Sequence, residues 1–197
     1  AGAIIRGMVS GGFRGGDVLA YDIDNAKLMA LFEDCGIRMC SSGQEVAEEA
    51  DAVVLAVKPQ VFGEALPPLA SSLHRHGPLV ISIAAGKTLR AMEELLGSGL
   101  PLVRVMPNLN AKVGEAMSAF CGNERMNEGH RGVVRMILES GGEAVELEEK
   151  QFPVFSVLSG CSPAYTLMYI DSLAEAGVRG GLPKPLALKI ASQAVLG

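Results

Sequence analysis

The residues from Asp17 to Val105 alternate between short apolar runs and longer amphipathic segments. The apolar runs are rich in Val, Ile and Leu, which is typical of strands covered on both faces. They predict strands over Val18–Tyr21, Ile37–Cys40, Ala52–Val57, Leu79–Ile83 and Leu102–Met106. The amphipathic segments predict helices over Ala26–Glu33, Gln44–Glu49, Val61–Leu73 and Leu89–Leu96. Strands that alternate with helices indicate an α/β fold with a doubly wound parallel sheet.

Beyond Val105 the pattern predicts two strands, Ala116–Cys121 and Glu143–Leu147, around a helix over Glu128–Ser140. These strands are expected to complete the sheet at its far edge. The remaining residues predict only helices, over Glu149–Leu158, Ala164–Ala176 and Lys184–Leu196. We therefore expect an α/β domain over residues 1–148 and a helical domain over residues 149–197. Because three helices are too few to bury their own apolar faces, we expect these faces to pack against further residues or a second subunit.

Composition and charge narrow the class of protein. Hydrophobic residues make up 49% of the chain and charged residues 20%, the balance of a folded globular protein. No apolar run approaches the roughly 18 residues of a membrane span, so we expect a soluble protein. The net charge is -5 and no Lys/Arg block occurs, which argues against a nucleic-acid partner. The four cysteines form no CxxC pair and no secretory segment precedes them, which favours reduced thiols in the cytoplasm.

The residues that follow the predicted strands are candidates for a ligand site, because parallel sheets bind ligands beyond the carboxyl ends of their strands. Asp22 follows the first strand, where a carboxylate accepts hydrogen bonds from an adenosine ribose and repels a 2′-phosphate. Ala56–Pro59, Ala84–Gly86 and Asn108 follow three later strands. Each small-residue turn alone could merely allow a tight strand-to-helix connection. Together they favour a flat dinucleotide bound largely by main-chain groups.

The GxGxxG loop that binds a dinucleotide pyrophosphate does not occur in the sequence. Gly11-Gly12 and Gly15-Gly16 lie between a predicted helix and a strand, where glycines end helices and present no helix N-terminus to phosphate. Residues 1–10 are instead typical of the helix that follows such a loop. We therefore expect the first strand and its Gly-rich loop to lie upstream of Ala1.

Several separated motifs resemble those of one enzyme family. They are AVKPQ at 56–60, ISIAAG at 81–86, RVMPN at 104–108, LSGCSPAY at 158–165, AEAGV at 174–178 and GLP at 181–183. In this combination and order the sequence resembles the pyrroline-5-carboxylate reductases. The resemblance implies a Rossmann-type domain followed by a helical dimerisation domain. It also implies reduction of 1-pyrroline-5-carboxylate to L-proline with NADPH or NADH, the last step of proline biosynthesis, in a homodimer or higher homo-oligomer.

The residues at the strand ends are our candidates for contacts with the cofactor. Ala84, Ala85 and Gly86, with Asn108, would hold the nicotinamide. Ala56, Val57, Lys58 and Pro59 would hold the middle of the dinucleotide. Asp22 favours NADH, although many members of the family use NADPH. The family's C-terminal GGxT motif does not occur here, and Gly43 stands where the family often has an adenosine-contacting Asn.

The predicted turn between the first two helices of the helical domain is the candidate substrate site. It consists of Ser159, Gly160, Cys161, Ser162, Pro163 and Ala164, where the family usually reads SGSGPA. Its main-chain N–H groups, at the start of the following helix, would attract the substrate carboxylate. The alternative is an interhelical turn capped by Ser162 with no binding role. Glu148, near the domain junction, is a candidate to approach the ring nitrogen of the substrate.

No catalytic side chain is assigned, because an iminium is already a good electrophile and alignment in a dry site supplies most of the acceleration. Cys161 has no nearby His in sequence and is expected to be a small buried residue, not a nucleophile. His74 and His76 lack acidic or Cys partners, so no metal site is expected. Two other functions stay open: a non-catalytic nucleotide-binding dimer, and another imine or keto-acid reductase with the same domain plan.

Overall fold

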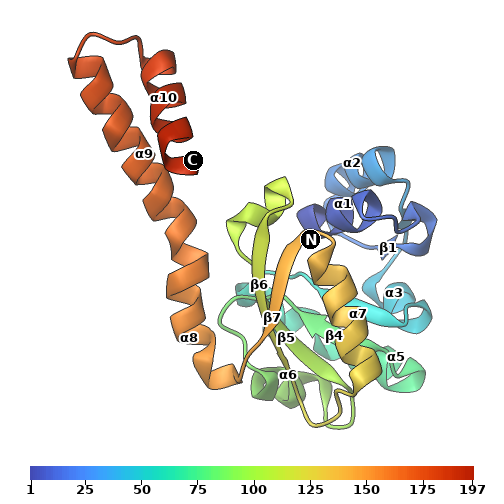
Figure 1. Ribbon diagram of the computed structural model, residues 1–197. Coiled ribbons are helices and arrows are strands. Elements are labelled where there is room, and N and C mark those ends of the chain that lie inside the picture. Colours follow the sequence, from blue (N-terminus) through green and yellow to red (C-terminus); the bar gives the residue numbers. More distant parts are fainter. The chain divides into compact units, whose positions relative to one another are not determined.

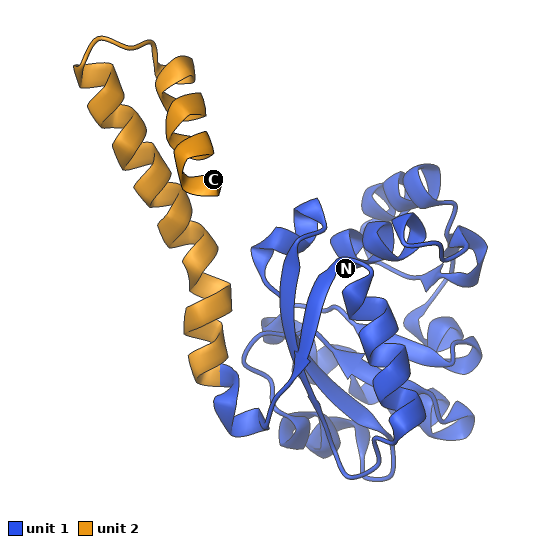
Figure 2. Cartoon of the chain, in the orientation of Figure 1, with its two compact units in different colours: residues 1–152 blue, residues 153–197 orange.

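The computed structural model describes residues 1–197 and divides the chain into two compact units, Ala1–Phe152 and Pro153–Gly197 (Figures 1 and 2). Unit 1 contains all of the strands and unit 2 contains only helices. This arrangement confirms the predicted α/β fold followed by a helical region.

Unit 1 is built on a five-stranded sheet with the order β3-β4-β5-β6-β7. The strands are β3 (Ala52–Leu55), β4 (Leu79–Ser82), β5 (Leu102–Met106), β6 (Ala116–Gly122) and β7 (Gly142–Glu146). All neighbours are parallel except β5 and β6, which are antiparallel. Only the 3-10 helix Leu109–Val113 lies between β5 and β6, and a short connection suits antiparallel neighbours. The sheet is therefore mainly parallel, with a reversal near its far edge.

The first two strands form a sheet of their own. Strands β1 (Leu19–Ala20) and β2 (Arg38–Met39) pair in parallel, and neither is hydrogen-bonded to β3. The predicted strands over 18–21 and 37–40 are thus confirmed in place, but one continuous sheet through β1, β2 and β3 is wrong. Main-chain hydrogen bonds form only between strands about 4.8 Å apart, and none joins β1 or β2 to β3.

The helices of unit 1 cover both faces of the sheet (Figure 1). They are α1 (Gly2–Ser10), α2 (Asn25–Cys35), α3 (Gly43–Glu49), α4 (Phe62–Ala65), α5 (Ala70–His76), α6 (Leu89–Leu96) and α7 (Glu128–Glu139). The single helix predicted over Val61–Leu73 is wrong, because the structure has 3-10 turns at Pro59–Val61 and Pro67–Leu69 around the short α4. Pro67 and Pro68 lack main-chain N–H groups, and their rings block a regular helix.

Two apolar layers cover opposite faces of the five-stranded sheet. Val80 and Leu102 pack with residues of α4, α5 and α6 in one cluster. Ile81 and Val103, their neighbours along the strands, pack with residues of α7 in the other cluster. Successive strand residues point to opposite faces, so strands that are apolar at every position require cover on both sides. The predicted burial of the sheet is confirmed.

Glycines mark the entry to the small sheet. Gly36 ends α2 in the left-handed conformation, with φ 64°. A Cβ on Gly15 would lie 1.8 Å from the Cys35 carbonyl oxygen, so only glycine allows the chain to pass there. Gly11 caps the end of α1. Gly11 and Gly15 lie between α1 and β1, as predicted, and Gly36 ends α2 before β2. All three allow backbone conformations or close approaches that a side chain would prevent.

Unit 2 contains the rest of α8 (Phe152–Phe155), a π-helical segment over Ser156–Cys161, α9 (Ser162–Arg179) and α10 (Lys184–Leu196). The predicted turn over 159–164 is wrong, because the π-helical segment leads directly into α9. Pro163 lacks an N–H group and its ring displaces the carbonyl one turn earlier, which is a known cause of helix widening. Ser162 is helical and does not cap α9; its hydroxyl donates a hydrogen bond to the Leu158 carbonyl.

Unit 2 buries very few side chains. Helices α9 and α10 pack through Ala174, Ala187 and Ala191, with Ile170 beside them. Many large apolar side chains of this unit are exposed, among them Leu167, Met168, Tyr169, Ile190 and Leu196. None of the helices in the chain has the length and apolar character needed to cross a membrane.

Candidate functional site

The carboxyl ends of β3, β4 and β5 form a continuous rim, because these strands are neighbours and parallel. The register pairs Leu55 with Ser82 at the ends of β3 and β4, and Ser82 with Arg104, two residues before the end of β5. Neighbouring strands lie about 4.8 Å apart, so the residues that follow them share one edge of the sheet. The structure thus brings together the three strand ends that the sequence predicted as a ligand site.

The loop after β4 has an anchored first half and an open second half. Ser82 is buried, and its hydroxyl accepts a hydrogen bond from the Ala84 N–H at 3.2 Å. Ala84 itself is 4% exposed, so its side chain faces the core and cannot contact a ligand. Ala85 and Gly86 are exposed, and a Cβ on Gly86 would meet no atom within 4 Å. Gly86 has φ 74°, a conformation that favours glycine. Main-chain groups of 85–86 are therefore open to a flat ring.

The residues after β3 combine small side chains with one free cation. Ala56 and Lys58 are exposed, and Val57 is half-buried. Pro59 begins a 3-10 turn directly after Lys58. No ion pair holds the Lys58 ammonium, so it is available to a phosphate.

Asn108 follows β5 and is half-buried. Its Oδ1 accepts a hydrogen bond from the Met117 N–H at 3.2 Å, which fixes the orientation of the amide. The sequence did not indicate this second task, because Met117 belongs to the reversed strand β6. Asn108 thus joins the end of β5 to β6 while lying on the candidate rim.

Asp22 lies two residues beyond β1 and is exposed. Its Oδ1 accepts a hydrogen bond from the Asp24 N–H at 2.9 Å, and Asp24 caps α2. The Lys27 ammonium, 3.0 Å from the Asp24 carboxylate, holds the pKa of Asp24 below its ordinary value. Near the end of β2, hydrogen bonds from Ser41 likewise lower the pKa of Glu45. Ionised carboxylates therefore dominate this part of the surface.

The candidate substrate residues lie in the π-helical segment and the first turn of α9, so no free helix N-terminus faces a carboxylate there. Gly160 and Cys161 are half-buried, and Ala164 is exposed. The expectation that Cys161 is buried is wrong. Glu148 is exposed, caps the 3-10 turn Glu149–Gln151, and forms an ion pair with Lys150 at 2.6 Å.

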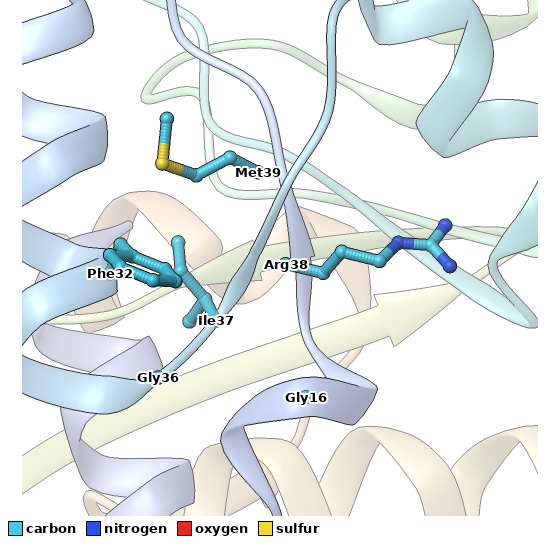
Figure 3. Close-up of a pocket in the computed structure, with 6 residues that line it drawn as sticks. All are labelled: Gly16, Phe32, Gly36, Ile37, Arg38 and Met39. Atoms are coloured by element: carbon cyan, nitrogen blue, oxygen red, sulfur yellow. The ribbon is translucent and has the colours of Figure 1, made fainter.

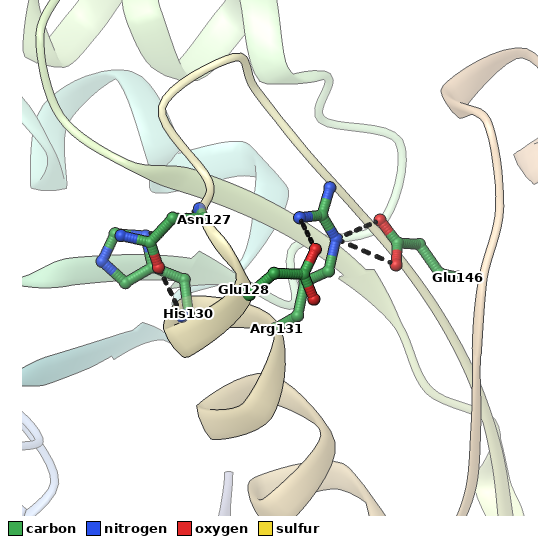
Figure 4. A network of polar contacts seen from close by, with 5 residues as sticks. All are labelled: Asn127, Glu128, His130, Arg131 and Glu146. Carbon is green, nitrogen blue, oxygen red and sulfur yellow. Dashed lines mark hydrogen bonds and ion pairs between the residues drawn. The ribbon is translucent and has the colours of Figure 1, made fainter.

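Two arginines of unit 1 make ionic contacts that the sequence did not indicate. Arg104 Nη1 lies 3.1 Å from Glu149 Oε1, and the Arg104 guanidinium lies 4.4 Å from the ring centre of Phe152. Arg131 of α7 forms ion pairs with Glu128 and Glu146 (Figure 4). The partners are far apart in sequence in the first case, so no local pattern indicates it.

An apolar pocket of about 330 Å³ is lined by residues of α2, of β2 and of the segments that precede β1 and β2 (Figure 3). It is lined by Gly16, Phe32, Gly36, Ile37, Arg38 and Met39. These residues precede or belong to the two strands, whereas the candidate rim follows the strands. The pocket is therefore separate from the candidate site.

No group of three or more His, Cys, Asp or Glu side chains is placed to hold a metal ion. His74 Nε2 instead lies 2.8 Å from the Leu96 carbonyl oxygen. Burial raises the pKa of the Cys121 thiol to about 11, which keeps that thiol protonated and unreactive at neutral pH.

Comparison with known proteins identifies the family. Residues 149–197 match the family described as pyrroline-5-carboxylate reductase dimerisation, and residues 1–86 match NADP oxidoreductase coenzyme F420-dependent. The chain is 37% identical over 198 residues to a pyrroline-5-carboxylate reductase of Arabidopsis thaliana, covering 100% of this chain and 71% of that protein. The chain belongs to the pyrroline-5-carboxylate reductase family. A reductase of this name from Escherichia coli (strain K12) is 37% identical and is matched over 99% of this chain and 72% of its own length.

Solved structures of the pyrroline-5-carboxylate reductase family have the same fold. The enzyme from Coxiella burnetii has a TM-score of 0.93 at 30% identity, covering 99% of this chain and 73% of that one. The Plasmodium falciparum enzyme, solved with NADP bound, has a TM-score of 0.88 at 31% identity, covering 99% and 71%. A prephenate dehydrogenase from Aquifex aeolicus, 18% identical with a TM-score of 0.65, shares the fold alone.

Proposed function

We propose that this chain reduces 1-pyrroline-5-carboxylate to L-proline with NADH or NADPH, the last step of proline biosynthesis, in the cytoplasm. The observation that carries the proposal is the adjacency of the β3, β4 and β5 ends, with open main chain at Gly86. The full-length similarity to enzymes named for this reaction supports it. We also propose that residues 1–148 bind the dinucleotide and that residues 149–197 form the dimerisation and substrate domain.

The residues present fit a nicotinamide dinucleotide. A flat ring can lie against main chain only where side chains are absent, and no atom lies within 4 Å of a Cβ built on Gly86. We propose that Ala84–Gly86 and Asn108 hold the nicotinamide end, with Ala84 contributing only main-chain groups. Ala56–Pro59 would contact the middle of the dinucleotide, where the unpaired Lys58 ammonium favours phosphate. Asp22 would accept hydrogen bonds from the adenosine ribose.

The charges near Asp22 favour NADH over NADPH. Lys27 is held by Asp24 and Arg38 is paired with Glu49, so both nearby cations are already neutralised. Asp22 itself is an exposed carboxylate. A 2′-phosphate placed here would meet like charge without a free basic partner, which disfavours binding. We therefore propose that this chain prefers NADH, although a relative was solved with NADP.

In the proposed reaction the bound cofactor supplies a hydride to the imine carbon of the ring. Protonation of the ring nitrogen by solvent would form the iminium, and hydride addition would then convert its C=N bond to the C–N single bond of the neutral amine. The chain contributes alignment and exclusion of water, which suffice for a reactive iminium. No residue of the rim is assigned as a general base.

We propose that the segment 159–164 contacts the substrate through its small side chains, not through free helix amides. π-Helical segments are rare and occur frequently at functional sites. Ser159, Gly160, Cys161, Ser162, Pro163 and Ala164 leave little bulk along this stretch. Glu148 is also kept as a proposed contact to the ring nitrogen, for which its ion pair with Lys150 would have to open.

We propose that unit 2 forms a homodimer, with higher assembly built on it. Its buried core consists of three alanines, which cannot offset the cost of ordering two long helices. The exposed apolar side chains of α9 and α10 therefore need a partner surface. The match of residues 149–197 to a dimerisation family supports a second copy of this chain as that partner.

The decisive experiment combines an assay with a matched pair of variants. NADH and NADPH oxidation is followed with 1-pyrroline-5-carboxylate, other cyclic imines and keto acids. Gly86 and Gly77 both have φ 74° with open space around a Cβ, but they lie at opposite ends of β4. Gly86→Ala and Gly77→Ala carry the same backbone strain, and only Gly86→Ala is expected to weaken cofactor binding.

Three outcomes of the assay would contradict the proposal in different ways. Cofactor binding without turnover of any substrate indicates the non-catalytic dimer. Turnover of another imine or a keto acid, with none of 1-pyrroline-5-carboxylate, indicates a different reductase. Equal loss of cofactor affinity in Gly86→Ala and Gly77→Ala places the cofactor elsewhere.

A further inference from the structure

One carboxylate oxygen ties together three segments of unit 1 that are distant in sequence. Glu149 Oε1 accepts a hydrogen bond from the Leu89 main-chain N–H at 2.9 Å. The same oxygen accepts a hydrogen bond from Arg104 Nη1 at 3.1 Å. Leu89 begins α6, Arg104 lies in β5, and Glu149 follows β7. The carboxylate thus fixes the start of a helix from a point 60 residues away.

The bond to Leu89 serves an amide that the local cap does not reach. Thr88 is the N-cap of α6, and its hydroxyl accepts from the Ala91 N–H at 3.1 Å. The first amides of a helix have no partner within the helix, and a carboxylate there is also favoured by the helix dipole. Glu149 therefore completes the capping of α6 and fixes its first residue.

The segment held in this way is the end of the candidate nicotinamide loop. Ser82 anchors the first half of the loop through the Ala84 N–H. The exposed residues 85–86 follow, and α6 begins three residues after Gly86. A loop fixed at both ends loses little further freedom when a ring binds to it, which strengthens binding by preorganisation. The Glu149 carboxylate thus anchors the segment that directly follows the loop carrying Gly86.

Arg104 holds the Glu149 carboxylate in place. The Arg104 side chain is 12% exposed and that of Glu149 is 32% exposed. The guanidinium also stacks on Phe152, whose side chain is buried. Cys121, opposite Arg104 in the β5–β6 register, adds no charge at neutral pH, because burial raises its thiol pKa to about 11. The negative charge of Glu149 is therefore balanced by the positive charge of the Arg104 guanidinium.

We propose that Glu149 is a positioning residue for cofactor binding, which holds the Ala84–Gly86 loop through the Leu89 amide and is itself oriented by Arg104. This inference rests on the proposed function, because it assigns a task within the same cofactor site. It adds that the first residue of the dimerisation match, Glu149, sets the geometry of the nucleotide-binding rim.

The test measures the Leu89 amide and cofactor affinity in the full chain. Glu149→Ala is expected to accelerate hydrogen exchange at the Leu89 amide and to weaken NADH and NADPH binding about tenfold, the effect of losing a charged hydrogen bond. Glu149→Gln keeps Oε1, the atom that accepts both bonds, and should retain most of the affinity and the protection. Retained affinity in Glu149→Gln would show that the position of the acceptor oxygen matters and that the negative charge does not. Arg104→Lys should fall between the two variants in both readouts.

Glu146 supplies a matched control. Its side chain is 33% exposed, close to the 32% of Glu149, and pairs with Arg131, so Glu146→Ala breaks a carboxylate–arginine pair in β7, the strand that precedes Glu149 (Figure 4). Glu146 contacts neither the Leu89 amide nor the candidate loop. Glu146→Ala should leave cofactor affinity and Leu89 exchange unchanged. The free energy of unfolding is measured for every variant, so that each loss of cofactor affinity can be compared with the loss of stability.

The outcomes that overturn the inference are distinct from failure of the proposed function. Unchanged cofactor affinity in Glu149→Ala overturns the inference alone. Equal losses of affinity in Glu149→Ala and Glu146→Ala, in step with stability, show a purely structural role. If Glu149→Ala does not fold, the test rests on Glu149→Gln. A loss of cofactor affinity of about tenfold in Glu149→Gln would contradict the argument that the Oε1 acceptor holds the loop. No binding of NADH or NADPH by the unaltered chain overturns both proposals.

Discussion

Gly177 of α9 and Ala187 of α10 lie so close that a Cβ on Gly177 would come within 3.0 Å of the Ala187 side chain. Leu182, in the connection between the helices, would lie 3.5 Å from the same Cβ. The two helices of unit 2 therefore pack closely because the residues at their contact are small. This contact explains why the family motif at 174–178 contains a glycine inside a helix, where glycine otherwise lowers stability.

Gly177→Leu is expected to separate α9 from α10 and to lower stability by about 1–3 kcal/mol, the usual cost of overpacking. Leucine is a good helix former, so the loss cannot come from helix propensity. The measurements are denaturant unfolding and the oligomeric state by light scattering. Gly132→Leu makes the same change in α7, where nothing lies within 4 Å of the Cβ, and should leave stability unchanged or raise it. Equal effects at the two positions would refute the close-contact argument.

Asp22→Ser should shift the cofactor preference toward NADPH. It removes the like charge that a 2′-phosphate would meet and leaves a hydroxyl for the ribose. We expect the ratio of NADPH to NADH affinity to rise about tenfold or more, as expected for one charged contact. Direct binding by cofactor fluorescence measures the ratio without turnover. Asp51→Ser, at the amino end of β3, makes the same change away from the rim and should leave the ratio unchanged.

The elements that could be predicted from the sequence are those encoded by local patterns. The strands at 79–82 and 102–106 and the helices at 89–96 and 184–196 follow from apolar periodicity within each segment. The single helix predicted over 61–73 is wrong because Pro67 and Pro68 interrupt a segment whose apolar spacing is otherwise helical. The turn predicted over 159–164 failed because Ser-Pro is a helix-start signal that a continuing helix also tolerates.

The candidate rim was predicted because topology alone brings the ends of parallel strands together. The loop at 84–86 could be placed in this way, but the burial of Ala84 could not, since it depends on packing across the sheet. The contact between Glu149 and Leu89 spans 60 residues and has no periodicity. Such contacts depend on the tertiary structure and leave no local signal in the sequence.

Asn127→Ala should destabilise helix α7 by about 1 kcal/mol, the typical value of an N-cap. The Asn127 Oδ1 accepts from the His130 N–H at 2.9 Å, and His130 Nδ1 accepts from the Asn127 N–H at 3.2 Å (Figure 4). Asn127→Asp keeps the acceptor and adds a charge that the helix dipole favours. It should therefore match or exceed the unaltered stability in denaturant unfolding. A loss in Asn127→Asp as large as that in Asn127→Ala would show that the cap is not the source of the effect.

Cys121 should make the protein lose stability in alkali. Burial, followed by the nearby Glu149 charge, raises its thiol pKa from 9.0 to about 11 in the folded chain. Between these two values the unfolded chain has released the thiol proton while the folded chain keeps it. The contribution to stability is thus complete below pH 9.0 and is lost as the pH rises toward about 11.

Cys121→Ala removes this titration and should flatten the decline of the unfolding free energy between about pH 9 and about pH 11. The quantity to compare is the slope of the unfolding free energy against pH, because loss of the thiol also changes packing at every pH. Lysine and tyrosine groups that titrate in the same range contribute equally to both proteins and cancel in the difference. Denaturant unfolding of the two proteins across this range measures it. Identical slopes would mean that the Cys121 thiol ionises in the folded chain as it does in the unfolded one.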